Sequence, residues 1–384
     1  MTAWNAGWSL GVYCNAGCAH CYSSRARRSG NELTLSDIDR VIGQLERLGV
    51  RTLNLGGNEP IFTNGRNIEA TTLPYVVLQA VRRGIDVGIT TNSTTCVYLC
   101  RERFEAWDAV NDWDLSIDSP FESEHDGNRR AKLWNQVLRA AELCTAHGKP
   151  KSFVMVAMNW NLTRRHLDEL LKLAAKYKAE IRVNTLKPLE RRHFSLMPTP
   201  DQIYGAFGYL LDRCETSVMG ESLLASLCGM TAPKGCPCGS ESFRISSKTA
   251  AGTIPITPCV YLNDQLTGDL LTEDLADSVQ AESFASFRRR RETRLDFCRD
   301  GSCGYWDTCR GGCAARAYLF GGGFDRPDPY CPKLLEKAGF KPPAFRPAEA
   351  GHTGLRVHEN YLCTWIGRVR QAEASEEVAA GSEG

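Results

Sequence analysis

Short apolar segments alternate with amphipathic segments through the first half of the chain. A strand is predicted at residues 8–13. Apolar side chains between residues 38 and 48 then recur at the spacing of one helix face, from an N-cap at Ser36 to a C-cap at Gly49. Five further strands are predicted at 53–55, 87–90, 115–118, 153–158 and 181–183. Helices are predicted between them at 74–83, 131–146 and 167–174. Six strands separated by helices indicate right-handed βαβ units and a parallel sheet, either open or curled into a barrel.

The composition is that of an ordinary globular protein. Of the 384 residues, 42% are hydrophobic and 24% are charged, and the net charge of +1 gives no sign of a nucleic-acid or membrane-surface partner. No apolar run is long enough to span a bilayer, and the first five residues lack the features of a signal peptide. We therefore expect a cytoplasmic protein that binds neither nucleic acid nor membrane.

The 17 cysteines change this picture. Because disulfides are disfavoured in the cytoplasm, metal clusters become the first interpretation of so many cysteines. Ten of them lie within residues 228–363, which predicts two differently built regions with a boundary near residues 200–230. Five cysteines, of which Cys363 belongs to those ten, are isolated and are expected to be plain buried thiols: Cys96, Cys100, Cys144, Cys214 and Cys363.

Three cysteines near the start form the most informative motif. Cys14, Cys18 and Cys21 follow the first predicted strand with the spacing Cys-x3-Cys-x2-Cys, and Tyr22 comes next. Three thiolates on one loop can hold three irons of a [4Fe–4S] cube and leave the fourth iron open for a cosubstrate. A zinc knuckle or a disulfide loop is the alternative. A zinc site should show a second CxxC or a paired histidine at ribbon spacing, which the sequence lacks here.

This motif resembles the signature of the radical S-adenosylmethionine (radical SAM) family. The resemblance implies that the open iron chelates S-adenosylmethionine and that one electron from the cluster releases a 5′-deoxyadenosyl radical. It also favours the family's partial (β/α)6 barrel, over residues 1–220, rather than an open Rossmann-like sheet.

Motifs at the ends of the predicted strands fit the same resemblance, since ligands gather at the carboxyl ends of parallel strands. Gly56-Gly57-Asn58-Glu59-Pro60 is similar to the family's GGEP element, with one residue inserted before the glutamate. The resemblance implies that it contacts the methionine moiety and that Glu59 pairs with an ammonium group. A plain turn is the alternative. The remaining implied cosubstrate contacts, which strand-end capping would also explain, are Tyr22, Asn92, Ser116 and Asp118.

The second cysteine block resembles the SPASM extension, which in many radical SAM enzymes holds two auxiliary iron–sulfur clusters. Its spacing keeps the family's x5 and x3 intervals, but x4 replaces x2 at its start. The resemblance implies two ligand sets: Cys238, Cys259 and Cys313 for the first cluster, and Cys298, Cys303, Cys309 and Cys331 for the second. The fourth ligand of the first cluster is left open between Cys236, Cys228 and an open iron. Structural zinc sites are the alternative interpretation.

The domain prediction follows from these blocks. The barrel is expected to end near residue 220, the SPASM domain covers 221–335, and a C-terminal extension covers 336–384, with a disordered tail from about residue 371. The run Arg288–Arg291 is expected to form a solvated helix face, with docking of an acidic peptide as the alternative. No residue stands out as a general base.

The resemblance implies an enzyme that oxidatively modifies a C–H bond. We expect the substrate to be a ribosomally made peptide. Only 13 residues precede Cys14, too few for a leader-binding module, so a separate small binding protein is expected to present the peptide. A reductase or a flavodoxin-type protein would supply electrons. Dehydrogenation of a small molecule, such as an aminocyclitol or a sugar alcohol, is the alternative. A more distant alternative is that the protein is a non-catalytic metal-binding scaffold.

Overall fold

The computed structural model describes residues 4–24, 32–228, 235–299, 303–343, 345, 353–360 and 364–370. Its strands form one sheet in the order β7-β10-β6-β5-β4-β3-β2-β1-β8-β9. The strands are β1 (Trp4–Ser9), β2 (Val50–Gly56), β3 (Asp86–Thr91), β4 (Asp112–Ser116), β5 (Lys151–Ala157), β6 (Glu180–Thr185), β7 (Cys214–Met219), β8 (Ser242–Ile245), β9 (Ile256–Thr257) and β10 (Thr364–Val369).

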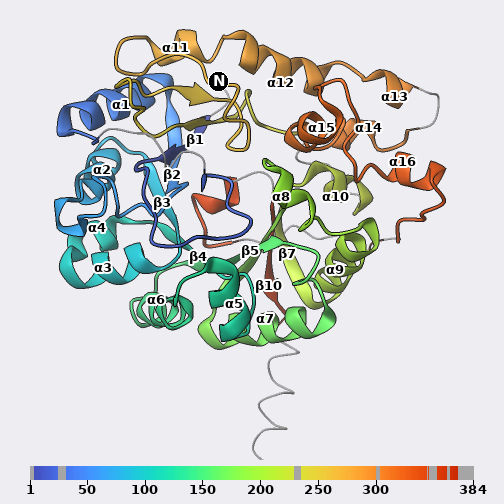
Figure 1. The fold of residues 1–384 in the computed structure, drawn as a ribbon, viewed down its shortest axis with the longest axis horizontal. Helices are drawn as coiled ribbons and strands as arrows, with labels where there is room; N and C mark the ends of the chain where they lie inside the picture. Colours follow the sequence, from blue (N-terminus) through green and yellow to red (C-terminus); the bar gives the residue numbers. More distant parts are fainter. Residues whose placement is uncertain are drawn as a thin grey trace, which may run out of the picture.

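Strands β1 to β6 pair in parallel with their sequence neighbours, which confirms the predicted partial (β/α)6 barrel. Helices surround the strands (Figure 1). Those of the barrel half are α1 (Leu35–Leu48), α2 (Leu73–Arg82), α3 (Thr94–Glu102), α4 (Phe104–Ala109), α5 (Glu122–Arg129), α6 (Trp134–Ala146), α7 (Arg164–Tyr177), α8 (Arg191–Phe194) and α9 (Pro200–Arg213), with the 3-10 turn η2 (Ile68–Ala70) before α2. None of the helices in the described part of the chain is long and apolar enough to cross a membrane.

Several predicted element boundaries differ from the structure, and two of these differences lie close to the cysteine loop in sequence. Strand β1 ends at Ser9, where its pairing with β2 stops, so residues 10–13 lead into the cysteine loop outside the sheet. Helix α1 begins after Thr34 rather than Ser36. The Thr34 hydroxyl accepts a hydrogen bond from the Asp37 amide, and the Asp37 carboxylate accepts one from the Thr34 amide, which together form a capping box. The predicted C-cap at Gly49 is confirmed, with a φ of 75°.

The sheet continues on both sides of the six parallel strands. On one side β8 pairs in parallel with β1, and on the other β10 lies antiparallel between β6 and β7. Residues on the far side of the boundary predicted near 220, and residues of the predicted extension, thus contribute strands to the same sheet. The domain limits stay a prediction. The predicted disordered tail and Cys363 lie outside the described residues.

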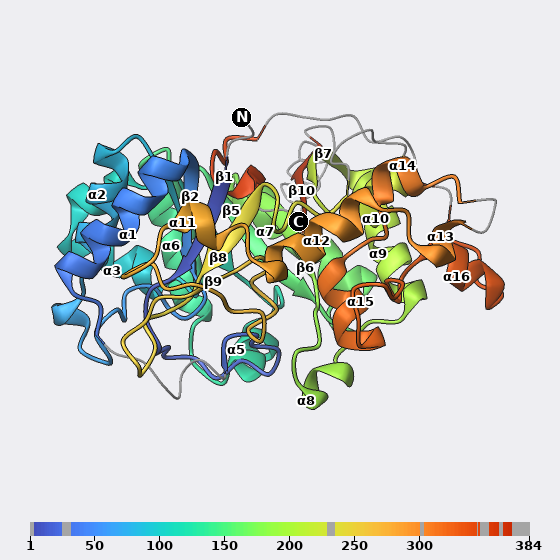
Figure 2. The ribbon, with the colours of Figure 1, turned by 90° about the horizontal axis from the view of Figure 1, so that it is seen from above.

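The helices of the cysteine-rich region are α10 (Ser222–Leu227), α11 (Leu275–Ser278), α12 (Glu282–Glu292), α13 (Asp296–Arg299), α14 (Trp306–Cys309), α15 (Ala314–Gly321) and α16 (Pro332–Lys337). Helices α13 to α16 of this region gather at one end of the molecule, on the side of α9, whereas α11 packs against α1 (Figure 2). The 3-10 turn η3 (His358–Asn360) precedes β10.

Arg289 on α12 is exposed, as predicted for the arginine run, but the prediction was wrong for Arg290. Arg290 is 3% exposed and donates hydrogen bonds to the carbonyls of Phe324, Gly311 and Arg326. Arg288 donates to the carbonyl oxygens of Gly239 and Val279, at 2.9 and 3.0 Å. The periodicity of α12 could not reveal this, because loops distant in sequence supply the acceptors.

A buried network around Arg316 joins this region to the barrel. Arg316, at the start of α15, pairs with Glu221 and with Asp328, each at 2.7 Å, and contacts the Thr185 hydroxyl at the end of β6. Burial alone would raise the pKa of the Glu221 carboxyl, but Arg316 and Lys187 hold it below its usual range. Asp328 also accepts a hydrogen bond of 2.7 Å from the Cys313 amide, so the network fixes a cysteine of the second block.

We expect Arg316→Met to destabilise the protein by about 3–5 kcal/mol, because the change leaves the Glu221 and Asp328 carboxylates buried without their cation. Thermal unfolding followed by circular dichroism measures the loss. Arg289→Met is the control, since Arg289 forms an exposed pair with Glu282 and its loss should hardly change the unfolding temperature. Equal unfolding temperatures for the two variants would show that the network does not hold the regions together.

Candidate active site

The loop after β1 brings the first three cysteines together. Cys18 is buried against Ala16 and Leu133, and Cys14 and Cys21 pack against this group. The Gly17 amide donates to the Arg129 carbonyl at 2.8 Å, and the Ala19 amide donates to the Asn128 carbonyl at 3.1 Å. The end of α5 therefore holds the loop in place through its backbone.

The donor set suits an iron–sulfur cube better than a single metal ion. Among the residues that the structure describes, no three His, Cys, Asp or Glu side chains converge on one point as ligands of one ion would. A cube does not require this, because each thiolate binds a different iron. Burial raises the pKa of the Cys18 thiol to about 12, and the nearby Arg129 acts in the opposite direction. A thiolate in this place therefore needs a positive partner, which iron supplies.

A cavity adjoins the three cysteines at the carboxyl ends of the strands. Tyr22, Gly57, Glu59, Asn92 and Ser116 all line it, so five of the predicted cosubstrate contacts share one enclosure. Gly57 has a φ of 91°, and a Cβ added there would overlap the Ser9 hydroxyl. Only glycine allows this close approach of the turn to β1.

Glu59 lines the cavity, but its carboxylate is already hydrogen-bonded within the chain. It accepts bonds from the amides of Asn92 and Thr95, at 2.8 and 2.9 Å, and from the hydroxyls of Thr91 and Thr95. Burial raises the pKa of this carboxyl, and these hydrogen bonds lower it. The glutamate thus ties the turn after β2 to the start of α3. Its pairing with an ammonium group stays a prediction.

Asp118 does not line this cavity, whereas its partner Arg129 does. The Asp118 carboxylate is fully buried and pairs with Arg129 at 2.9 Å, while Asn128 donates to it at 2.8 Å. Burial alone would raise the pKa of Asp118, but Arg129 and His20 hold it well below its usual range. Asp118 therefore orients a guanidinium toward the cavity. The sequence analysis missed Arg129, which lies on a helix outside every strand-end motif.

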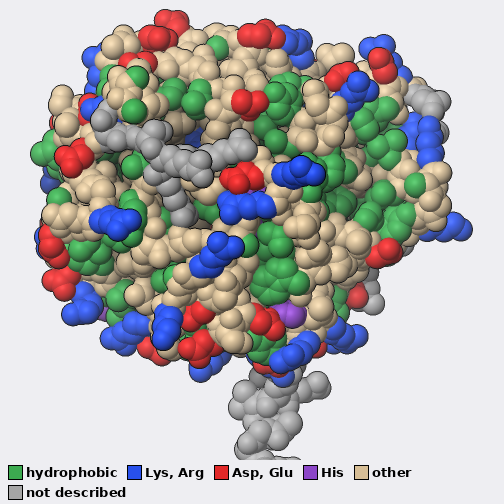
Figure 3. All heavy atoms as spheres, viewed as in Figure 1, with side chains coloured by type: hydrophobic (Ala, Val, Ile, Leu, Met, Phe, Trp, Pro, Cys, Tyr) green, Lys and Arg blue, Asp and Glu red, His purple; other side chains and the backbone are tan. Residues whose placement is uncertain are grey.

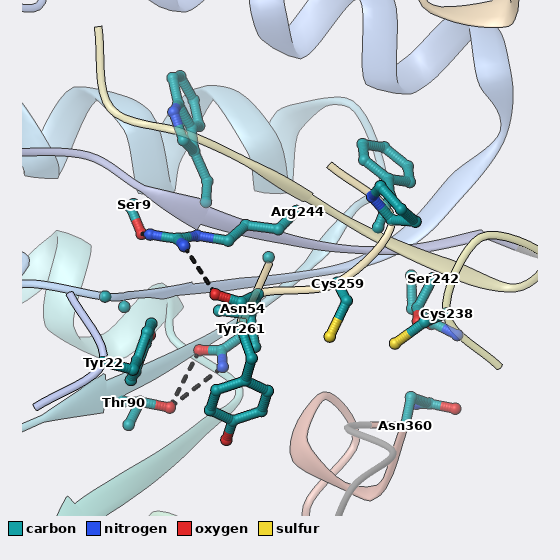
Figure 4. Close-up of a pocket in the computed structure, with 18 of the residues that line it drawn as sticks. Ser9, Tyr22, Asn54, Thr90, Cys238, Ser242, Arg244, Cys259, Tyr261 and Asn360 are labelled. Atoms are coloured by element: carbon teal, nitrogen blue, oxygen red, sulfur yellow. Dashed lines mark hydrogen bonds between the residues drawn. The ribbon is translucent and has the colours of Figure 1, made fainter. Parts of the chain in front are cut away.

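A second cavity continues from the first into the middle of the barrel. Gly57, Tyr22 and Tyr261 line both cavities. The rings of Tyr22 and Tyr261 meet edge to face, with centroids 5.4 Å apart. Cys238 and Cys259 line the second cavity on the side away from Tyr22 and pack in one cluster (Figure 4). The barrel cavity therefore has cysteines of the first block at one end and of the second block at the other.

The structure sorts the second block into the same two sets as the sequence did. Cys238, Cys259 and Cys313 pack in one cluster with Leu262 and Phe287. The other four cysteines line one separate small cavity: Cys298, Cys303, Cys309 and Cys331. The ligand assignments themselves remain predictions.

The two candidates for a fourth ligand lie in different surroundings. Cys228 is 2% exposed within the main hydrophobic core, and burial alone raises the pKa of its thiol to about 12. Cys236 lies near Arg290, whose guanidinium also lies near Cys313 and Cys309. Arg290 thus lies near both Cys236 and Cys313, whereas Cys228 is at the end of α10, which packs against α14.

Charges on the surface are mixed. On the face shown in Figure 3, Lys and Arg side chains lie among Asp, Glu and hydrophobic side chains, without a continuous patch of one sign. This face lacks the basic stripe typical of nucleic-acid-binding proteins.

Comparisons with known proteins agree with this geometry. Residues 8–185 match the model of the radical SAM superfamily. The chain is 30% identical over 336 residues to the mycofactocin maturase MftC of Mycobacterium tuberculosis, covering 84% of this chain and 81% of that protein.

Two solved structures share the fold. One is SuiB of Streptococcus suis bound to S-adenosylmethionine, with a TM-score of 0.63, 16% identity, and coverage of 86% of this chain and 77% of that one. The other is anSMEcpe with bound AdoMet, with a TM-score of 0.64, 14% identity, and coverage of 86% and 95%. The chain belongs to the radical SAM superfamily, in the branch that carries a C-terminal SPASM region, and it is an enzyme.

Proposed function

We propose that this enzyme oxidatively modifies a C–H bond in a ribosomally made peptide. The observation that carries the proposal is the pair of adjoining cavities, which share Tyr22, Gly57 and Tyr261 in their walls; one is lined by Cys14, Cys18 and Cys21 and the other by Cys238 and Cys259. A substrate that occupied both would contact the site of radical formation at one end and an electron-accepting cluster at the other.

Three thiolates, from Cys14, Cys18 and Cys21, would hold the [4Fe–4S] cluster beside S-adenosylmethionine. When bound, this pair supplies a 5′-deoxyadenosyl radical, formed by one-electron reduction and able to take a hydrogen atom from a C–H bond. Tyr22, Gly57, Asn92, Ser116 and Arg129 line the cavity that would receive the cosubstrate. Of these, Arg129 is the cation suited to its carboxylate, and Asp118 holds the guanidinium in place.

Two auxiliary clusters would accept the electron left on the substrate. We assign the first to Cys238, Cys259 and Cys313, with Cys236 as the fourth ligand, because Cys236 and Cys313 both lie near Arg290. Cys228 sits instead in the main hydrophobic core, outside the cluster that Cys238, Cys259 and Cys313 form. The second cluster would be held by Cys298, Cys303, Cys309 and Cys331.

The peptide substrate is supported by the nature of the relatives. MftC is a maturase by name, and SuiB has been solved bound to its precursor peptide SuiA. We further propose that a separate small protein presents the peptide and that a flavodoxin-type reductant supplies electrons in the cytoplasm.

The cluster assignment predicts a selective loss. Replacing Cys14, Cys18 and Cys21 together by Ala should abolish reductive cleavage of S-adenosylmethionine and remove one cube, about four irons, while leaving the auxiliary clusters. Iron and sulfide counting after anaerobic reconstitution, with 5′-deoxyadenosine measured by chromatography, tests this. Cleavage at the wild-type rate would contradict the assignment, and bound zinc without visible absorption would contradict the cluster itself.

The fourth ligand can be tested with a matched pair of variants. Cys236→Ala should lower the iron content and alter the electron paramagnetic resonance spectrum of the first auxiliary cluster. Cys228→Ala should leave both unchanged and only lower stability, by about 1 kcal/mol or more from lost packing. The reverse pattern would assign the ligand to Cys228, and no change in either variant would leave that iron open.

The substrate class is tested by co-expression with candidate precursor peptides and candidate small binding proteins taken from the neighbouring genes. We expect a change in peptide mass that requires S-adenosylmethionine, the reductant and an intact Cys14. If the peptide stays unmodified while an aminocyclitol or sugar alcohol is oxidised with one S-adenosylmethionine consumed per turnover, the enzyme is a small-molecule dehydrogenase instead.

A further inference from the structure

One buried cation in the barrel cavity has no carboxylate partner among the described residues. Arg244, on β8, is 4% exposed and lines the cavity that ends at Cys238 and Cys259. Its guanidinium donates to the Ser9 hydroxyl at 3.1 Å, to the Val260 carbonyl at 3.0 Å and to the Asn263 side-chain oxygen at 3.1 Å. All three acceptors are neutral.

The other cations around the two cavities have anionic neighbours. Arg182 pairs with Asp114, Arg129 pairs with Asp118, and Lys187 lies near enough to Glu221 to lower the pKa of its carboxyl. Moreover, no Asp or Glu is among the described residues that line the second cavity, whereas Glu59 of the first cavity is hydrogen-bonded within the chain. An anion entering the second cavity would meet the Arg244 guanidinium and no carboxylate of the described residues.

A buried charge without a counter-charge is costly, since neutral hydrogen bonds replace only part of its hydration. The sulfur atoms of Cys238 and Cys259 do not supply that counter-charge directly, because the guanidinium extends toward Ser9 and away from both (Figure 4). The guanidinium lies instead beside Gly57, since a Cβ added to Gly57 would be 3.4 Å from Arg244 Nη2. Its Cζ atom is 5.5 Å from the centroid of the Tyr22 ring. The cation thus lies where the two cavities meet.

We propose that Arg244 binds a carboxylate of the substrate and thereby sets which carbon of the peptide lies beside the cosubstrate; this rests on the proposed peptide function. A guanidinium recognises a carboxylate through charge-assisted hydrogen bonds, and the aromatic rings of Tyr22 and Tyr261 offer apolar walls on the same side. Two parts of a peptide carry this chemistry, its C-terminus and an acidic side chain.

Small probes test the site without requiring turnover. The reconstituted enzyme is saturated with S-adenosylmethionine, so that the carboxylate site of the cosubstrate is filled, and binding is followed by calorimetry. N-acetyl-phenylalanine is compared with its amide for the C-terminal source, and N-acetyl-glutamate α-amide with N-acetyl-glutamine amide for the side-chain source. In at least one pair we expect the acid to bind about 10-fold or more tightly than the neutral form.

Arg244→Gln should abolish that preference and Arg244→Lys should keep part of it. The matched control is Lys248→Gln, which removes a positive charge from the same segment. Lys248 pairs with Asp37 at 2.8 Å and lines neither cavity, so the preference should persist.

Equal binding of acid and amide in both pairs by the wild-type enzyme would overturn the proposal. So would a preference that vanishes once S-adenosylmethionine is present, because Arg244 would then belong to the cosubstrate site. A preference that survives in Arg244→Gln would overturn it as well. An acid preference lost in Arg244→Gln, in an enzyme that modifies no peptide, would uphold the carboxylate site while rejecting the peptide function.

Discussion

The buried pairing of Arg316 with Glu221 and Asp328 is the interaction on which the arrangement of the two halves depends. It links the end of β6, through Thr185, with the turn after β7 and the start of α15. Such a network favours folding only when every member is satisfied, since each charge left alone would be buried at high cost. It therefore permits essentially one placement of Cys313 relative to the barrel, because Asp328 also binds the Cys313 amide.

The parallel sheet supplies the second constraint. Its strands end at the same edge, so that motifs spread over more than a hundred residues line one enclosure. Strand β8 then extends the sheet beside β1 and carries Arg244, next to the Cys238 turn, against that enclosure. In the proposed function, this continuity places the peptide between the sites of hydrogen abstraction and electron acceptance, behind walls that limit access of water to a radical.

Electrostatics inside the barrel follow one pattern with one exception. Arg129 and Arg182 are held by buried aspartates, which fix their direction and offset their charge. Arg244 is held by neutral oxygens alone. Arg129 and Arg182 can orient a bound group while their own charge is already offset by an aspartate. The charge of Arg244 is instead offset by an anion that binds in the cavity.

The sequence by itself determined the chemistry and the class of fold. Thiolate spacing at Cys14, Cys18 and Cys21 is a local property, and so is the alternation of apolar segments that predicts six parallel strands. The division of the second cysteine block into two ligand sets was implied by the resemblance of its spacing to the SPASM pattern. The tertiary structure alone decided which polar side chains face the cavity. Asp118 belongs to a strand-end motif, but its carboxylate pairs with Arg129. Arg290 belongs to a charged run, but its side chain is buried and donates a hydrogen bond to the Gly311 carbonyl. In both cases the partner comes from another segment of the chain. Arg244 likewise belongs to no motif. That no carboxylate of the described residues pairs with it is a property of the space around it, which no spacing along the chain encodes.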